Sequence, residues 1–156
     1  MPEIVNVEMA AAWDGGQGDE WVQREDQMNA ALAAHTARLL AAAAVGRNEL
    51  VLDVGCGTGE TTRACAERAV GGRVLGVDLS TAMLERGRMR AADAGLTNID
   101  FERGDAQVYP FASGHFDWQT AAQLERLARQ RCEISEYCAS PGGRISRPSA
   151  LQRMSA

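Results

Sequence analysis

The sequence is poor in several residue types, and each shortage narrows what the protein can do. It contains no lysine, so all 16 basic residues are arginine, a bias to which we attach no function. The net charge of −5 and the absence of a basic stripe with interleaved aromatic residues disfavour a nucleic-acid-binding surface. No segment approaches the roughly 20 apolar residues of a membrane span, and the first residues do not resemble a secretion signal. We therefore expect a cytoplasmic protein with small-molecule or protein substrates.

Cysteine and histidine are also scarce, which limits metal chemistry. The sequence contains two histidines, His35 and His115, and four cysteines, Cys56, Cys65, Cys132 and Cys138. No two cysteines have the Cys-x-x-Cys spacing, and the histidines do not complete a zinc site with them. We therefore expect no metal, and we interpret Cys56 and Cys65 as buried apolar filling rather than as reactive thiols. Neither histidine has a setting that marks a catalytic base, so we assign none.

Apolar and helix-forming segments alternate along residues 28–103, which predicts an α/β fold. At 156 residues the chain suits a single domain. Strands that alternate with helices predict a mostly parallel sheet. Ser80 and Gly95 are suitable start and stop residues for one helix, and Gly46 is a suitable stop for another. The expected helices are residues 28–45, 60–69 and 81–94, and the expected strands are residues 50–54, 73–77 and 99–103.

A glycine-rich turn follows the first expected strand and is the strongest functional signal in the sequence. Residues 51–59 read Val-Leu-Asp-Val-Gly-Cys-Gly-Thr-Gly. Gly55, Gly57 and Gly59 allow a sharp turn and a close approach of the backbone to a ligand, because no Cβ intervenes. A dinucleotide-binding loop would carry a third glycine where this chain has Glu60, and a carboxylate there would repel a pyrophosphate. The pattern therefore favours a nucleotide cofactor without a phosphate.

Three aspartates lie at the ends of the three expected strands. Asp53 precedes the glycines, where a carboxylate suits a cation such as an ammonium group. Asp78 ends the second apolar run, where a carboxylate can accept hydrogen bonds from both ribose hydroxyls. Asp105 follows the third strand. Because open α/β sheets bind ligands beyond the carboxyl ends of their strands, we expect all three side chains to line one crevice.

These residues resemble the motifs of the class I S-adenosylmethionine-dependent methyltransferases, in particular the ubiquinone/menaquinone-type, methyltransferase type 11-like enzymes. Residues 51–59 resemble motif I of that family. Further along the chain the resemblance includes Asp78-Leu79-Ser80, Gly104-Asp105-Ala106, Tyr109-Pro110-Phe111 and Phe116-Asp117. Residues 12–15 and 20–22 resemble the leader helix that closes over the cofactor, and Trp13 and Trp21 there suit apolar anchoring better than cofactor contact. The resemblance covers about residues 10–118.

The resemblance implies a Rossmann-like three-layer sandwich with a mostly parallel sheet, S-adenosyl-L-methionine as the cofactor and a small molecule as the methyl acceptor. It implies that Asp53 faces the ammonium group and that Asp78 holds the ribose hydroxyls. Leu79 would pack on the adenine, and Asp105 with the Ala106 amide would contact the adenine edge. The implied cofactor-binding residues are Asp53, Gly55, Cys56, Gly57, Gly59, Asp78, Leu79, Asp105 and Ala106.

The composition changes after residue 118. Residues 1–118 contain ten arginines and eighteen acidic residues, whereas residues 119–156 contain six arginines and three acidic residues. Residues 119–136 can be written as one helix, and Pro148 would interrupt a strand after the Pro-Gly-Gly turn at 141–143. We expect residues 1–118 to form leader helices and the cofactor-binding half of a methyltransferase domain. Residues 119–156 would form a divergent tail, helical and then irregular, that leaves the C-terminal strands incomplete.

Two accounts of the tail and three functions stay open. The tail is either a divergent or shifted reading of a methyltransferase sequence, or a natural truncation. Either account would expose an apolar edge and face of the sheet, from which we expect a homodimer, strand swapping or marginal stability. The first function is an S-adenosylmethionine-dependent methyltransferase acting on a small molecule. The second is a non-catalytic remnant that binds the cofactor or has a structural role. The third and weakest, which Glu60 disfavours, is a nicotinamide-binding oxidoreductase.

Overall fold

Five parallel strands form one sheet in the order β3-β2-β1-β4-β5. The computed structural model describes residues 3–111, 116, 118–121 and 144–145. The strands are β1 (Leu50–Val54), β2 (Arg73–Asp78), β3 (Ile99–Arg103), β4 (Trp118–Ala121) and β5 (Arg144–Ile145). The expected α/β fold with a parallel sheet is confirmed, and β1 lies at the centre of the sheet.

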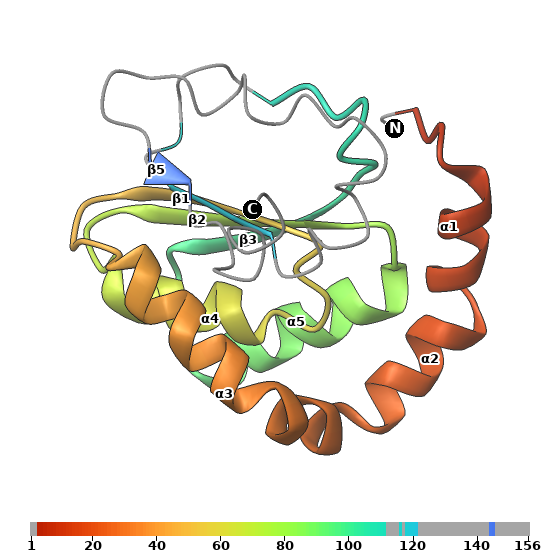
Figure 1. The fold of residues 1–156 in the computed structure, drawn as a ribbon, viewed down its shortest axis with the longest axis horizontal. Helices are drawn as coiled ribbons and strands as arrows, with labels where there is room; N and C mark the ends of the chain where they lie inside the picture. The colour runs from red at the N-terminus through yellow and green to blue at the C-terminus, as the bar shows by residue number, and fades with distance from the viewer. Residues whose placement is uncertain (1–2, 112–115, 117, 122–143, 146–156) are drawn as a thin grey trace, which may run out of the picture.

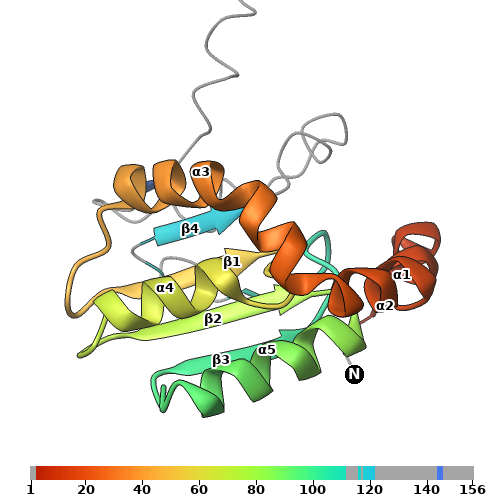
Figure 2. The same ribbon diagram turned by 90° about the horizontal axis from the view of Figure 1, so that it is seen from below.

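Five helices accompany these strands in the described part of the chain. Helices α3 (Glu25–Ala43), α4 (Glu60–Arg68) and α5 (Thr81–Asp93) lie along one face of the sheet (Figure 1). Helices α1 (Val7–Trp13) and α2 (Gly16–Gln23) lie beyond the carboxyl ends of the strands, which point toward them in Figure 2. No helix among the described residues is long and apolar enough to cross a membrane. The leader helices therefore stand at the edge of the sheet where α/β proteins bind ligands.

The side chains of the central strands alternate between the two faces of the sheet, as a period of two requires. Val51 and Val74 are fully buried on the face covered by α3 and α4. Leu52 and Val77 belong to a separate apolar cluster, which includes Phe111 and lies on the opposite face. Each face of the sheet thus has its own apolar core, and a residue's position in its strand decides which core it joins.

Three glycines surround the ring of Phe101 in β3. A Cβ on Gly59 would lie 2.6 Å from that ring, and one on Gly87 would lie 2.9 Å from it. A Cβ on Gly76 would lie 3.1 Å from the same ring. Because interiors are packed to crystal density, these contacts leave no room for a side chain. The three glycines allow α4, α5 and β2 to pack against one aromatic residue.

The expected helices and strands between residues 28 and 103 are confirmed, with small shifts of their ends. Ser80 caps α5 as expected, since its Oγ accepts the backbone N–H of Met83 at 3.3 Å. Gly95 follows that helix in the left-handed region, at φ +69°. The stop expected at Gly46 is wrong, because α3 ends at Ala43 and Ala44 turns left-handed with φ +44°.

The early turn at Ala44 has a packing reason. Ala43 and Val45 are both buried in the core beneath α3, whereas Ala44 between them is exposed. A left-handed residue reverses the chain within one step, so Val45 enters the core directly after Ala43. The burial of Ala43 and Val45 therefore places the turn at Ala44, although Gly46 would adopt a left-handed conformation more easily.

The helix expected to begin at Gln119 is wrong at its start. Trp118–Ala121 form β4, which pairs with Val51–Val54 of β1, and Arg144–Ile145 form β5 beside it. The boundary expected after residue 118 therefore falls inside a strand of the sheet. Without β4, one edge of β1 would lack backbone partners, and the pairing that supplies them overrides a weak local helix preference. Residues 122–143 and 146–156, with the rest of the expected helix, the 141–143 turn and Pro148, lie outside the described residues.

We expect Ala44→Gly to raise the free energy of unfolding by about 1 kcal/mol, because glycine removes the cost of a left-handed L-residue. Ala42→Gly is the matched control, since Ala42 is an exposed position inside α3. It should lower the free energy of unfolding by about 1 kcal/mol. Urea denaturation of both variants measures the difference. Equal effects of the same sign would contradict the assigned turn.

Candidate functional site

A cavity of about 570 Å³ lies at the carboxyl ends of β1, β2 and β3. Its volume falls in the range of roughly 300–1,000 Å³ that is typical of small-molecule sites. Residues 54–58, 77–79 and 104–107, which follow or end the three strands, line one side. Residues of α1, α2, α3 and the first turn of α4 line the other side. The site is therefore enclosed between the sheet and the leader helices.

The glycine loop after β1 folds back onto the end of β2. The backbone N–H groups of Gly55 and Cys56 donate to the carbonyl oxygen of Val77 at 2.8 and 3.2 Å. The N–H of Gly57 donates to Oδ2 of Asp78 at 2.8 Å. Gly55 and Gly57 have φ values of +71° and +56°, which glycine adopts without strain. The loop therefore presents its backbone to the cavity in a conformation that other residues would resist.

Asp78 lines the cavity and is bonded on both carboxylate oxygens. Besides Gly57, the N–H of Ser80 donates to its Oδ1 at 2.9 Å. Burial raises the pKa of Asp78 above its ordinary value of 3.8, and the backbone N–H donors from Ser80, Gly57 and Leu79 partly oppose that rise. The carboxylate is thus held in a fixed position at the cavity, so a ligand hydroxyl there would meet a strong acceptor.

Cys56 also lines the cavity, and its thiol is buried. Burial, and then the carboxylates of Asp53 and Asp78, raises the pKa of this thiol well above its ordinary value. Cys56 is therefore protonated at neutral pH and is a poor nucleophile. In the described part of the chain no group of three metal-ligating side chains forms either.

Of the nine expected site residues, seven line the cavity: Gly55, Cys56, Gly57, Asp78, Leu79, Asp105 and Ala106. Asp53 and Gly59 do not. The Asp53 side chain is fully buried, and its Oδ2 accepts the hydroxyl of Thr62 in α4 at 2.7 Å. Strand alternation directs Asp53 under α4, on the face of Val51, so it lies outside the lining of this cavity, and its role toward a cofactor stays a prediction. Gly59 instead contacts Phe101 and precedes the first residue of α4.

Helices α1 and α2 form part of the cavity wall, where the resemblance to the leader helix places residues 12–15 and 20–22. Asn6, Glu8 and Met9 line the cavity near the start of α1, and Trp13 and Trp21 line it further along. The two tryptophan rings meet edge to face, with centroids 6.2 Å apart and planes at 66°. Such a pair stabilises the contact between the two helices, as the expected anchoring role requires, and also presents aromatic surface to the cavity.

Helix α3 contributes a third set of cavity residues. Asn29, Leu32 and Thr36 line the cavity and are spaced at i, i+3 and i+7, so they lie on one face of the helix. Glu60 and Thr61, at the start of α4, line the same cavity. Burial raises the pKa of Glu60, and the charge of Arg63 opposes that rise. The helical spacing was the available signal for the α3 residues, but it does not distinguish a cavity face from a core face.

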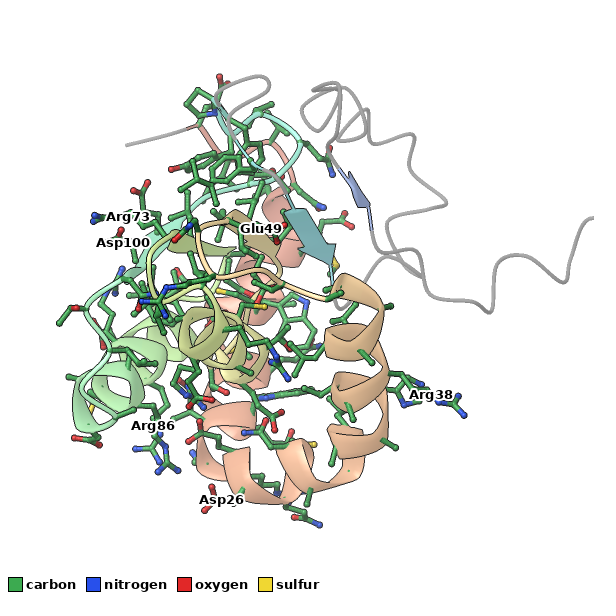
Figure 3. All side chains as sticks on the ribbon, turned by 90° about the vertical axis from the view of Figure 1, so that its left-hand side faces the viewer. Asp26, Arg38, Glu49, Arg73, Arg86 and Asp100 are labelled. Atoms are coloured by element: carbon green, nitrogen blue, oxygen red, sulfur yellow. The ribbon has the colours of Figure 1, made fainter. Side chains whose placement is uncertain are left out.

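Charged contacts hold the leader helices to the rest of the fold. Asp14 accepts the N–H of Thr81 at 2.6 Å and the Arg103 guanidinium at 2.8 Å. The buried Glu25 accepts Nε of Arg86 at 2.6 Å and lies 3.0 Å from Arg90 Nη2. Figure 3 shows Arg86 on the same side of the molecule as the start of α3. The leader is therefore fastened to α5 at two points along its length.

A model of the methyltransferase domain family matches residues 51–139. The chain belongs to the class I S-adenosylmethionine-dependent methyltransferase family. The match extends beyond residue 118, where the sequence resemblance was expected to end. The family assignment agrees with the parallel sheet and with the cavity at its carboxyl edge.

Relatives and solved structures agree with this membership. The chain is 41% identical over 99 residues to the demethylmenaquinone methyltransferase of Shouchella clausii, which covers 60% of this chain and 42% of that protein. It is 39% identical over 100 residues to a probable chloroplastic tocopherol O-methyltransferase of Oryza sativa subsp. japonica, covering 61% of this chain and 27% of that protein. The chain thus spans less than half of the length of either relative.

A solved structure shares the fold over most of the chain. It is the S-adenosylmethionine-dependent methyltransferase of Thiobacillus denitrificans, solved in complex with S-adenosylhomocysteine. The superposition has a TM-score of 0.58 and 28% sequence identity, and it covers 70% of this chain and 45% of that one.

We expect Glu25→Gln to lower the free energy of unfolding by about 2 kcal/mol near neutral pH, because it weakens two hydrogen bonds to a charged group. Although burial raises it, the hydrogen bonds from Arg86 and Arg90 hold the pKa of Glu25 below its ordinary value of 4.5. The stability that the ionised Glu25 contributes is therefore present at neutral pH and is lost as the pH falls through that lowered pKa.

The matched control is Asp26→Asn, which removes the other acidic partner of Arg90. The Asp26 side chain is 92% exposed, so this change should alter stability by less than about 0.5 kcal/mol. Denaturant titrations at several pH values compare the two variants. A Glu25→Gln variant as stable as the control at neutral pH would contradict the anchoring role.

Proposed function

We propose that this chain binds S-adenosylmethionine in the cavity and transfers its methyl group to a small-molecule acceptor. The observation that carries the proposal is the meeting of the glycine loop, Asp78 and Asp105 around one cavity. The family match to residues 51–139 supports the same cofactor. The printed names of two relatives, a demethylmenaquinone and a probable tocopherol methyltransferase, support a small-molecule acceptor.

The cavity offers a suitable group for each part of this cofactor. Asp78 would accept hydrogen bonds from the ribose hydroxyls, because its carboxylate faces the cavity between the loop and β2. Leu79 would pack against the adenine, and Asp105 and Ala106 would contact the adenine edge. Gly55, Cys56 and Gly57 would lie along the methionine portion. We propose that Asp53 and Gly59 support this loop from behind, through Thr62 and Phe101.

A nicotinamide dinucleotide fits the cavity less well. Its pyrophosphate would lie at the start of α4, as in dinucleotide-binding folds. Glu60 occupies that position and lines the cavity. A carboxylate there repels phosphate groups, whereas it attracts the cationic methionine portion of S-adenosylmethionine. The charge at this position therefore supports the methyl donor over the dinucleotide.

The face of α3 suits the acceptor. Asn29, Leu32 and Thr36 lie on the cavity side of that helix, and the loop and the start of α4 line the same cavity. We propose that the acceptor packs against Leu32 and forms hydrogen bonds with Asn29 or Thr36. When bound, S-adenosylmethionine supplies a methyl group on a sulfonium, and its transfer depends mainly on an in-line approach of the acceptor. The helix face would therefore act by positioning, and no described residue is assigned as a base.

A second candidate is a protein that binds the cofactor without catalysis, or that has a structural role. The sequence spans less than half of the two curated relatives described above. On this view residues 1–118 supply leader helices and the cofactor-binding half, and residues 119–156 supply a tail that begins within β4. A homodimer through the sheet edge stays a prediction, and light scattering tests it. Methyl transfer from labelled S-adenosylmethionine to a panel of hydroxyl- and ring-containing acceptors separates an enzyme from a binding protein.

Calorimetric titration tests the cofactor assignment directly. We expect S-adenosylhomocysteine to bind and a nicotinamide dinucleotide to give no heat. Asp78→Ala should weaken S-adenosylhomocysteine binding by about 1.5–3 kcal/mol, the range for hydrogen bonds to a charged group. Asp100→Ala, on the exposed side of β3, is the control and should bind as the wild type does. Absence of heat with S-adenosylhomocysteine, in protein with a cooperative melt, would refute the proposal.

The affinity for S-adenosylhomocysteine should also depend on pH through Asp78. Ribose hydroxyls donate to the ionised carboxylate, so binding favours that form. Because burial raises the pKa of Asp78, protonation begins at higher pH than for an exposed aspartate. Affinity should therefore fall as the pH is lowered through this raised pKa. Asp78→Asn should lose most of this fall, and equal pH profiles for the two proteins would contradict the ribose assignment.

A further inference from the structure

The Asp105 carboxylate is bonded to a segment almost one hundred residues away in the sequence. Its Oδ2 accepts the backbone N–H of Asn6 at 2.7 Å and that of Val5 at 3.1 Å. Its Oδ1 accepts the N–H of Gln107 at 3.0 Å. The residue is 3% exposed, so the contacts form away from bulk water. Asp105 therefore joins the start of α1 to the floor of the cavity.

Besides its contact with α2 through Trp13 and Trp21, helix α1 has little buried surface. It is seven residues long, and its N-cap, Asn6, makes no side-chain capping bond. A helix of this length is not stable by itself in water. Ala10 is its one buried residue, and Val7 is 68% exposed. Polar contacts at its two ends, to Asp105 at the start and from Asp14 at the finish, therefore hold it over the cavity.

The same carboxylate has capacity for one more donor. A carboxylate accepts about four hydrogen bonds, two on each oxygen. Val5 and Asn6 use both positions of Oδ2, and Gln107 uses one position of Oδ1. Asp105 lines the cavity, so a ligand donor that reaches this 3% exposed carboxylate would take the remaining position. An amino group on an adenine ring would complete the set without displacing the N-terminal segment.

We propose that Asp105 is a positioning residue that couples cofactor binding to the closure of α1 over the cavity. This inference rests on the proposed function. Asn6, Glu8 and Met9 line the cavity only while α1 is held there, so a bound cofactor gains these contacts in the closed form alone. A ligand with extra contacts in one form shifts the protein toward that form. Closure in turn strengthens cofactor binding by the same factor, because coupling is reciprocal.

Two substitutions at Asn6 separate the coupling from direct cofactor contact. Asn6→Pro removes the N–H that donates to Asp105 and leaves the Asp105 carboxylate free to bind adenine. The φ of Asn6, −86°, is close to the range of proline. Asn6→Ala is the matched control, because it removes the same side chain and keeps the N–H. Any contribution of the asparagine side chain to binding is lost equally in both variants.

Hydrogen exchange and calorimetry with S-adenosylhomocysteine measure the effect. In the wild type and in Asn6→Ala, S-adenosylhomocysteine should slow amide exchange in residues 3–13. In Asn6→Pro this protection should disappear, and the affinity should be at least about fivefold weaker than in Asn6→Ala. Exchange in β1 and β2 and the melting temperature should be the same in all three proteins, which distinguishes coupling from general loss of structure.

Each possible failure points to a different conclusion. Equal affinities of Asn6→Pro and Asn6→Ala, or exchange in residues 3–13 that does not respond to S-adenosylhomocysteine although it binds, would overturn the coupling and leave the proposed function intact. Absence of binding to the folded wild type would overturn the proposed function and the coupling together.

Discussion

The cavity depends on the hydrogen bonds that hold the glycine loop against the end of β2. The carbonyl oxygen of Val77 accepts two loop N–H groups, and Asp78 accepts a third from Gly57. These bonds require left-handed backbone at Gly55 and Gly57, so the loop and the strand end have one joint conformation. Asp78 thus holds the loop in its conformation and also lines the cavity. Asp105 has the same double character, because it faces the cavity while it holds backbone N–H groups of other segments.

Most of the fold was predictable because local signals and tertiary packing agree between residues 50 and 103. Ser80, for example, caps its helix in the way that its side chain allows in isolation. Prediction failed where the two disagree. Ala44 turns left-handed because its neighbours are both buried, and Trp118–Ala121 become a strand because one edge of β1 would otherwise lack backbone partners. Neither the burial on both sides of Ala44 nor the need of β1 for a second partner strand is visible in the local sequence.

The loop, the strand ends and the leader over them were predictable parts of the site, whereas the α3 face was not. The loop, the strand-end acids and the leader lie in or close to recognisable motifs, whereas α3 reaches the cavity through contacts distant in sequence. The position of Asp53 had a signal in the sequence, since two-residue alternation places it on the same face as Val51, under α4. The interaction with Thr62 that follows is a buried one, which explains how a carboxylate is accommodated within the central strand.

The ring of Phe101 gives one glycine of the motif, Gly59, a role in packing. Gly59, Gly76 and Gly87 each lie close to this ring, although they belong to three different segments. A smaller residue at 101 would relieve the contact at Gly87, whereas Gly59 would still need its left-handed backbone at φ +76° and a side chain at Gly76 would still meet Cys56. Within the motif, Gly55 and Gly57 carry information about a ligand. Gly59 instead lets α4 approach Phe101 in the sheet closely. Packing alone would therefore preserve this glycine in a chain that no longer bound a cofactor.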